Sequence, residues 1–288
     1  ESLGDHLRLV GVCPEEEIGL GVPRETVRLE VRPGSDAFRM VAPASRKDHT
    51  RVMRRYARDV VSNLTRLPIS GYVLKRGSPS CGVGGMDVFD AKGRCRRDGR
   101  GLFVEALLAK LPELPVEESD ALDAPWRCEN FVVRIFAYER MNRLFADRWT
   151  RRELLAFHGR EALLLRAHDW KAPARLLDLI ESHDARDRKR LAVAYRAAFM
   201  AVLKRRATPA KEARVLRHVA ALLRRHLDRS DRDELSDAIA RYRRGEGLPL
   251  LAPLTLLRHH LRRAGLVDVM AQSYVVMDPR EEALRFHA

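Results

Sequence analysis

The sequence has few cysteines, few aromatic residues and no long apolar run. Its 288 residues include four cysteines, and aromatic side chains make up 6% of the chain. No two cysteines have the C-x-x-C spacing of a zinc ribbon or finger, and a chain of this size has no need of a disulfide framework. No run of about 18 apolar residues occurs, and Glu1 opens a polar stretch without a secretory signal. We therefore expect a cytoplasmic protein with no membrane contact.

Positive charge is abundant and unevenly placed. The formal net charge is +14, of which residues 1–145 contribute +3 and residues 146–288 contribute +11. A basic surface attracts polyanions, so the second half is a candidate for contact with RNA or DNA. Arginines on solvated helix faces are the ordinary alternative. Trp149, Trp170 and Tyr274 are interpreted as packing residues rather than as platforms for stacked bases.

The first part of the chain alternates between strand and helix patterns. Strands are predicted at 9–12, 27–31, 72–74 and 87–90, helices at 48–67 and 102–111, and a charged turn at 91–100. This alternation predicts an α/β domain over residues 1–115, with an acidic, proline-containing connection and a helix over 116–148.

The rest of the chain, residues 149–288, is predicted to be a basic all-α domain. Thr150 and Glu153 have the spacing of a capping box that opens a helix to about His168. Thr208 with Pro209, and Ser230 with Asp233, are predicted to open further helices, and another follows Pro253 to Gly265. His158 and His168 lie ten residues apart, and His259 and His260 are adjacent, which are not metal-ligand spacings on a helix.

Two cysteines lie where a strand is expected to end. Cys13 precedes Pro14 and Glu15, and Cys81 lies in the glycine-rich stretch GYVLKRGSPSCGVGG at 71–85, which also contains Ser78. The carboxyl edge of an open α/β sheet is where ligands bind, so this topology can bring both cysteines together. Lys75 and Arg76 would favour a Cys81 thiolate. Two thiolates with a carboxylate and a hydroxyl suit a metal or an iron–sulfur cluster. The alternative is that both cysteines are small buried apolar residues.

Several motifs resemble known families. VGVCPEEEIGLGVPRETVRL at 10–29, GYVLKRGSPSCG at 71–82 and GRGLFVEALL at 99–108 resemble the bacterial domain of unknown function 523, an α/β family that includes the thiouracil desulfurases. The second half resembles the domain of unknown function 1722 through LLAFHGREALLLRAH at 154–168, YRRGEGLPLLAPLTLLRHH at 242–260 and QSYVVMDPREEALR at 272–285.

The resemblance implies a 4Fe–4S cluster held by three cysteines, with Cys13 and Cys81 as two of the ligands. Glu15 and Ser78 match the positions expected to assist catalysis, Glu15 in proton transfer and Ser78 in positioning substrate or water. The third ligand belongs to an amino-terminal motif, C-L-L-G, that we expect upstream of Glu1, because the sequence lacks an initiator Met. The alternative is that this protein lacks the ligand. Cys95 and Cys128 lie outside the family motifs.

These observations predict an enzyme that removes sulfur from a small thiolated nucleobase or a related compound and releases sulfide. The alternative is a nucleic-acid-binding or interaction protein whose α/β domain is a degenerate scaffold. A third reading joins the two domains in sulfur handling on transfer RNA.

Overall fold

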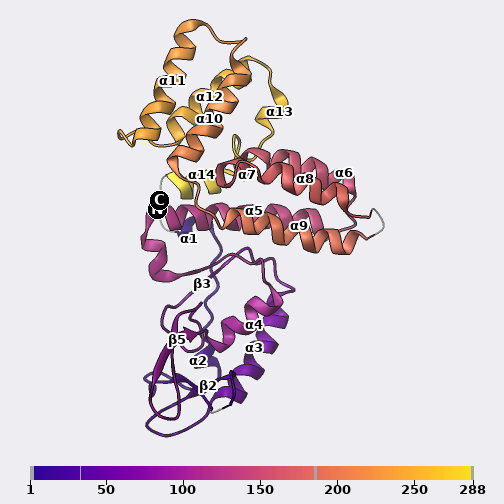
Figure 1. The fold of residues 1–288 in the computed structure, drawn as a ribbon. Helices are drawn as coiled ribbons and strands as arrows, with labels where there is room; N and C mark the ends of the chain where they lie inside the picture. Colours follow the sequence, from indigo (N-terminus) through magenta and orange to yellow (C-terminus); the bar gives the residue numbers. More distant parts are fainter. Residues whose placement is uncertain (1–2, 33, 185–186, 287–288) are drawn as a thin grey trace. The chain divides into compact units, whose positions relative to one another are not determined.

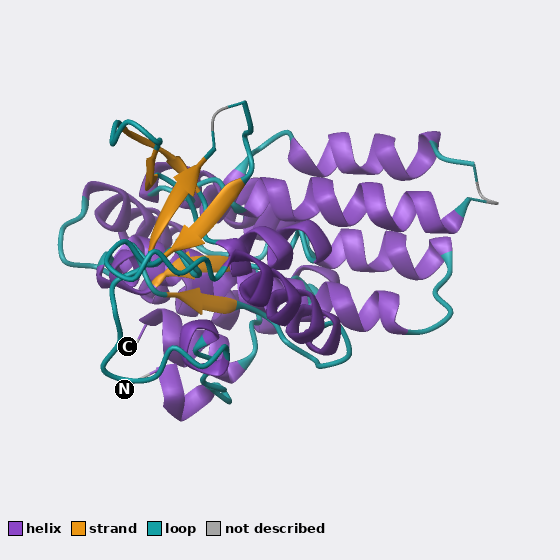
Figure 2. Cartoon of the chain, turned by 90° about the horizontal axis from the view of Figure 1, so that it is seen from below, coloured by secondary structure: helices purple, strands orange, loops and turns teal. Residues whose placement is uncertain are grey.

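The computed structural model describes residues 3–32, 34–184 and 187–286. The chain forms two compact units, Leu7–Phe131 and Glu1–His6 with Val132–Ala288, which divide inside helix α5 (Pro125–Ala146). All strands of the described chain lie between residues 28 and 118, and residues 125–286 are helical where they form regular structure (Figures 1 and 2). An α/β domain followed by an all-α domain is therefore confirmed. The predicted domain limits at 115 and 148 stay a prediction.

The first unit contains two small sheets where the sequence predicts one. The strands are β1 (Arg28–Val31), β2 (Phe38–Val41), β3 (Tyr72–Leu74), β4 (Met86–Phe89), β5 (Cys95–Gly99) and β6 (Val116–Glu118). Four of them form a mixed sheet of order β2-β1-β4-β5, in which β1 and β4 are parallel and the two outer pairs are antiparallel. β3 instead pairs in parallel with β6, so the strand that leads toward Cys81 belongs to a separate two-stranded sheet.

The strand predicted at 9–12 is wrong. These residues lie outside regular structure, and the side chains of Leu9 and Val10 are 67% and 75% exposed. An apolar run forms a strand only where a neighbouring strand completes its hydrogen bonds, and residues 9–12 have no such neighbour in the described chain. Cys13 therefore does not follow a strand. It precedes the short helix α2 (Pro14–Glu17), with Pro14 in the first helical position.

The charged stretch at 91–100, predicted as a turn, contains strand β5. Its arginines face water along the edge of the sheet, where Arg97 pairs with Asp87 of β4 at 3.1 Å. Charged side chains are typical of edge strands, where they discourage pairing with other molecules. The connection predicted at the start of 116–148 likewise contains β6 and a 3-10 helix, η1 (Ser119–Asp123).

Two helices form part of the apolar core of the first unit, which also includes Leu29, Met40 and Val88 of the four-stranded sheet. α3 (Thr50–Leu64) buries Met53, Ala57, Val61 and Leu64 at the spacing of one helix face, and it packs against α4 (Leu102–Lys110). Both helices agree with the sequence prediction, because threefold and fourfold apolar spacing specifies which face turns inward.

The second unit is built from helices of one to six turns. They are α1 (Leu3–His6), most of α5, α6 (Arg151–Arg160), α7 (Ala162–His168), α8 (Ala172–Ser182), α9 (Arg188–Leu203), α10 (Pro209–Leu223), α11 (Arg229–Arg244), α12 (Leu251–Arg263), α13 (Val267–Met270) and α14 (Pro279–Phe286). None of the helices in the described chain combines the length and apolar character that crossing a bilayer requires.

Two of the predicted helix starts are confirmed, and others are shifted. Thr150 forms the capping box with Glu153, and the Thr208 side chain accepts the Lys211 N–H. α11 is instead capped by Asp228, whose side chain accepts the Asp231 N–H, so Ser230 lies within the helix. α12 begins at Leu251, before the predicted start, so Pro253 lies inside its first turn. Proline is tolerated there because an N–H in the first turn has no partner within the helix.

The helix predicted from Thr150 to His168 is divided at Glu161. This carboxylate is 2% exposed and accepts hydrogen bonds from Arg140 of α5 at 2.8 and 3.1 Å. Arg140 also binds Glu281 of α14 at 2.9 Å, and Ser273 donates to Glu161 at 2.7 Å. A buried charge needs such partners, so this network fixes how α5, the α6–α7 junction and the last helix meet.

Candidate active site

The loop that carries Cys81 folds back on its own first serine. The carbonyl oxygen of Ser78 accepts the N–H groups of Cys81 and Gly82 at 3.1 and 2.8 Å. The Ser78 hydroxyl oxygen also lies 3.3 Å from the N–H groups of Ser80 and Cys81. Serine favours such local turns because its short side chain reaches nearby backbone groups. The sequence S-P-S-C therefore forms a rigid turn that presents three polar side chains together.

Helix α4 holds this turn in place. The N–H groups of Leu102 and Phe103 donate to the carbonyl oxygens of Pro79 and Ser80, both at 3.1 Å, and the Gly101 N–H donates to Gly82 at 2.9 Å. The first N–H groups of a helix have no partners within the helix, so they are available for such contacts. A Cβ atom on Gly101 would lie 2.3 Å from the Ser80 carbonyl oxygen and 2.7 Å from the Cys81 nitrogen. Only glycine allows this close approach.

Glu15 is the centre of the polar cluster. Its Oε1 accepts hydrogen bonds from Ser78 Oγ at 2.6 Å and Ser80 Oγ at 2.7 Å, and its Oε2 lies 3.0 Å from Arg24 Nε. The Glu15 side chain is 12% exposed. A carboxylate with a guanidinium on one oxygen and two hydroxyls on the other has a fixed orientation. It is placed to accept a proton from either hydroxyl or from a water molecule beside them.

The thiols of Cys13 and Cys81 contact different members of this cluster. Arg24 Nη2 donates to Cys13 Sγ at 3.8 Å, and Ser80 Oγ lies 3.5 Å from Cys81 Sγ. Burial raises the pKa of Cys81, and the charges of Glu15 and Cys13 act in the same direction. The two cysteines are therefore close enough to influence each other electrostatically, although Cys13 and Cys81 are 68 residues apart in the sequence.

The expectation that Lys75 and Arg76 favour a Cys81 thiolate is wrong. Arg76 pairs with Asp120 at 3.0 Å instead of with the cysteine, and the Arg76 side chain is 72% exposed. Burial of the thiol outweighs such distant charges, because desolvation disfavours the ionised form. A thiolate at Cys81 would therefore need a closer positive partner, such as a bound metal.

Two tyrosines and a phenylalanine adjoin the thiols. The ring of Phe103 lies 6.2 Å from that of Tyr56 and 5.8 Å from that of Tyr72, between centroids. Burial raises the pKa of both tyrosine hydroxyls, and the Cys81 thiol adds to this effect at each of them. Phe103 is fully buried and the two tyrosines are half-buried, so the tyrosine rings are the aromatic groups of this region that reach solvent.

Comparison with known proteins agrees with this division of the chain. Residues 1–119 match the family model of 2-thiouracil desulfurase, and residues 163–279 match that of a protein of unknown function, DUF1722. Over 158 residues the chain is 32% identical to the uncharacterized protein YbgA of Escherichia coli K12, an alignment that covers 54% of this chain and 93% of YbgA. The chain belongs to the same family as YbgA, and it matches both the 2-thiouracil desulfurase and the DUF1722 family models in separate stretches. No solved structure matches the chain.

The desulfurase-like domain indicates a sulfur-related function, and its four predicted site residues all lie in the first unit. Glu15, Ser78 and Cys81 are joined by the hydrogen bonds given above, and Cys13 is linked to them through Arg24. Cys95 is exposed on β5 and Cys128 is half-buried on α5. The assignment of Cys13 and Cys81 as cluster ligands, and of Glu15 and Ser78 as catalytic residues, stays a prediction.

Sequence reasoning missed Arg24 and Ser80. Both lie inside the quoted motifs, Arg24 in GVPR and Ser80 in SPSC, so a signal was present. The sequence does not show that Arg24 and Ser80 both contact Glu15, one at each carboxylate oxygen, because the three residues come from separate segments.

The donor set fits a cluster only in part. Cys13 and Cys81 provide two thiols, whereas no three His, Cys, Asp or Glu side chains within the described ranges are grouped so that they could hold a metal ion. Glu15 is already occupied by two serines and an arginine. The residues present are thus suited to give two thiolate ligands and leave Glu15 for proton transfer.

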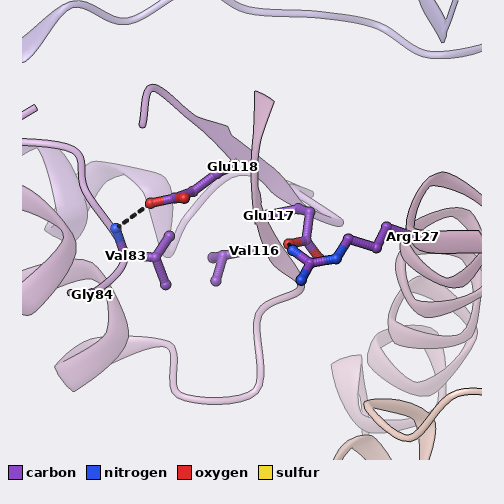
Figure 3. A pocket seen from close by; sticks show the side chains of 6 residues that line it. All are labelled: Val83, Gly84, Val116, Glu117, Glu118 and Arg127. Carbon is purple, nitrogen blue, oxygen red and sulfur yellow. Dashed lines mark hydrogen bonds and ion pairs between the residues drawn. The ribbon is translucent and has the colours of Figure 1, made fainter. Parts of the chain in front are cut away.

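A hollow of about 260 Å³ lies on the chain immediately beyond Cys81. It is lined by Val83, Gly84, Val116, Glu117, Glu118 and Arg127 (Figure 3). Glu118 of β6 accepts the Val83 N–H at 3.2 Å, and this contact ties the end of the cysteine loop to the two-stranded sheet. None of the residues that line this hollow belongs to the group formed by Glu15, Ser78, Ser80 and Arg24. We therefore place the candidate active site at that group and not at the hollow.

Proposed function

We propose that the first unit removes sulfur from a small thiolated nucleobase or a related thiocarbonyl compound with the aid of a 4Fe–4S cluster. The observation that supports this most is the Glu15 carboxylate, held by Ser78, Ser80 and Arg24 beside two thiols. The family match to 2-thiouracil desulfurase supports the same class of substrate.

The overall reaction is hydrolysis of a carbon–sulfur double bond. Water provides the oxygen of the new C=O group, and the sulfur leaves with both hydrogens as hydrogen sulfide. Cys13 and Cys81 would be two ligands of the cluster, and a further ligand stays a prediction. A bound cluster with an open iron position would act as a Lewis acid toward the soft sulfur atom of the substrate.

The residues of this chain would manage the protons and orient the substrate. Glu15 Oε1 is within hydrogen-bond distance of both serine hydroxyls, so it can accept the proton that water loses when it attacks. Ser78 would position that water or the substrate. Tyr56 and Tyr72, both half-buried against Phe103, would limit the access of solvent and contact a planar ring.

The proposal is tested by anaerobic reconstitution of the full-length protein with iron and sulfide. We expect about four irons and four sulfides per chain, a visible absorption band, and sulfide release from 2-thiouracil. Cys13→Ala and Cys81→Ala should each lose bound iron and activity. Cys95→Ala is the matched control and should keep both, because this thiol is exposed on β5.

Colourless, iron-free protein that releases no sulfide would contradict the proposal. RNA binding that depends on salt and is unchanged in Cys81→Ala would then favour the alternative, a binding protein with a degenerate α/β unit.

A further inference from the structure

A concentration of positive charge in the second unit lies where two helix junctions meet. α7 packs against α8, α9 and α10, so the α7–α8 turn adjoins the α9–α10 turn (Figure 1). The Asp169 carboxylate in the first turn pairs with Arg205 in the second, and His168 Nδ1 is hydrogen-bonded to the Arg205 carbonyl oxygen. Lys211 Nζ binds the carbonyl oxygens of His168 and Arg206 at 2.9 and 2.8 Å.

These two segments are strongly basic. Residues 166–175 and 204–218 contain nine lysines and arginines against two acidic residues, Asp169 and Glu212. Asp169 is neutralised by Arg175 and Arg205, and Glu212 is buried, where it accepts the Tyr274 hydroxyl. Lys171, Lys204, Arg214 and Arg217 are exposed, and their segments contain no carboxylate besides Asp169 and Glu212.

Trp170 organises two of these cations. The guanidinium carbon of Arg214 lies 4.0 Å from the centre of its ring, and that of Arg166 lies 4.7 Å from it. The ring of His218 meets the indole edge-on at 5.5 Å. Among the ion pairs of the described chain, none involves Arg166 or Arg214. A guanidinium that stacks on an aromatic face keeps its N–H edge available for hydrogen bonds.

The side chains of this arrangement are accessible to solvent. Arg214 is exposed, and Arg166, Trp170 and His218 are half-buried. The charge of Arg166 lowers the pKa of His218, in addition to the larger effect of burial. His218 is therefore mainly neutral at pH 7, and the two arginines provide the positive charge beside the indole.

We infer that Arg166 and Arg214, held on Trp170, bind the phosphate backbone of a nucleic acid. Two guanidinium edges close together match successive phosphate oxygens and carry no base specificity. The indole is already covered by guanidinium groups, so it supports the arginines rather than stacking on a base. This inference rests on the second unit alone and does not depend on the proposed desulfuration.

The test measures binding of the full chain to a fluorescein-labelled mixed-sequence RNA of about 20 nucleotides, longer than the ~4–16 nucleotides that a single site covers. Anisotropy is recorded between about 50 and 200 mM salt. The variant Arg166→Gln/Arg214→Gln removes both guanidinium groups. The control Arg225→Gln/Arg263→Gln removes the same charge from exposed helix ends of the same unit.

We expect the first variant to bind RNA at least about tenfold more weakly than the control. The slope of log K against log salt should fall by about 1.4, from two lost phosphate contacts at ~0.7 each for a single strand. Circular dichroism of both variants should match that of the wild-type chain, which shows that the loss is not unfolding.

Equal affinities and slopes for the two double variants would overturn the inference, as would a wild-type chain that does not bind RNA at all. Poly-glutamate of matched length and charge is the comparison ligand. If it binds as tightly as RNA, the surface recognises negative charge in general and the assignment to nucleic acid is wrong.

Discussion

At the scale of single residues, the candidate site depends on Arg24 as much as on the residues that the motifs single out. Its guanidinium contacts Glu15 Oε2 at 3.0 Å and Cys13 Sγ at 3.8 Å, and it also donates to the Gly21 carbonyl oxygen at 3.0 Å. One side chain thus connects the carboxylate, a thiol and the loop that follows α2. Groups that orient metal ligands and catalytic residues in this way are often as necessary as the ligands themselves.

We predict that Arg24→Gln lowers the rate of sulfide release from 2-thiouracil by about 10- to 100-fold, because Glu15 loses its charged partner. Arg24→Lys should recover part of the rate, since it keeps the charge but not the planar fork. Arg28→Gln is the control, because Arg28 pairs with Glu30 of β1 at 2.8 Å. A wild-type rate in Arg24→Gln would show that the contact is dispensable.

At the scale of elements, the start of α4 determines where the cysteine loop lies. Gly101 adopts φ −61° and ψ 138°, which alanine also adopts freely, so its requirement is steric. The close contact is with the backbone of Ser80 and Cys81, which cannot move aside as a flexible side chain would. The motif GRGLFVEALL therefore has a structural meaning: it brings a helix N-terminus against the loop.

We predict that Gly101→Ala destabilises the chain by about 1–3 kcal/mol and reduces the iron retained after reconstitution, because the Cys81 loop must shift. Gly84→Ala is the matched control in the same loop, since nothing lies within 4 Å of the added Cβ. Urea unfolding and iron content are measured for both. If the two variants behave alike, the close approach at Gly101 does not constrain the loop.

At the scale of the whole molecule, the second unit keeps titratable groups inside its core. His168 is 2% exposed, and burial lowers its pKa from 6.5 to about 4, with Arg285, Lys211 and Arg134 acting in the same direction. The hydrogen bond to the Arg205 carbonyl oxygen opposes this shift but does not cancel it. The folded chain therefore holds His168 neutral at pH values where the unfolded chain protonates it.

Stability should consequently fall as the pH drops from about 6.5 to 4. Above 6.5 the histidine is neutral in both states, and below it the unfolded state gains a proton that the folded state does not bind. The pKa difference corresponds to roughly 3 kcal/mol at most. We predict that His168→Gln flattens this part of the curve of unfolding free energy against pH, measured by urea titration. His226→Gln, at an exposed histidine, should leave the curve unchanged, and parallel curves for all three proteins would contradict the prediction.

The sequence by itself determined the fold class and most of the helices. Apolar spacing specified the buried face of α3, and the side chains of Thr150 and Thr208 specified where α6 and α10 begin, because these signals act within one or two turns of helix. It also indicated Cys13, Glu15, Ser78 and Cys81 as candidate site residues through motifs. Only the tertiary structure decided that residues 9–12 are not a strand, that β5 and β6 are strands, and that Arg24 and Ser80 meet at Glu15. The physical reason is that a strand needs a partner and a carboxylate needs donors, and both come from segments far along the chain, which the packing of the core brings together.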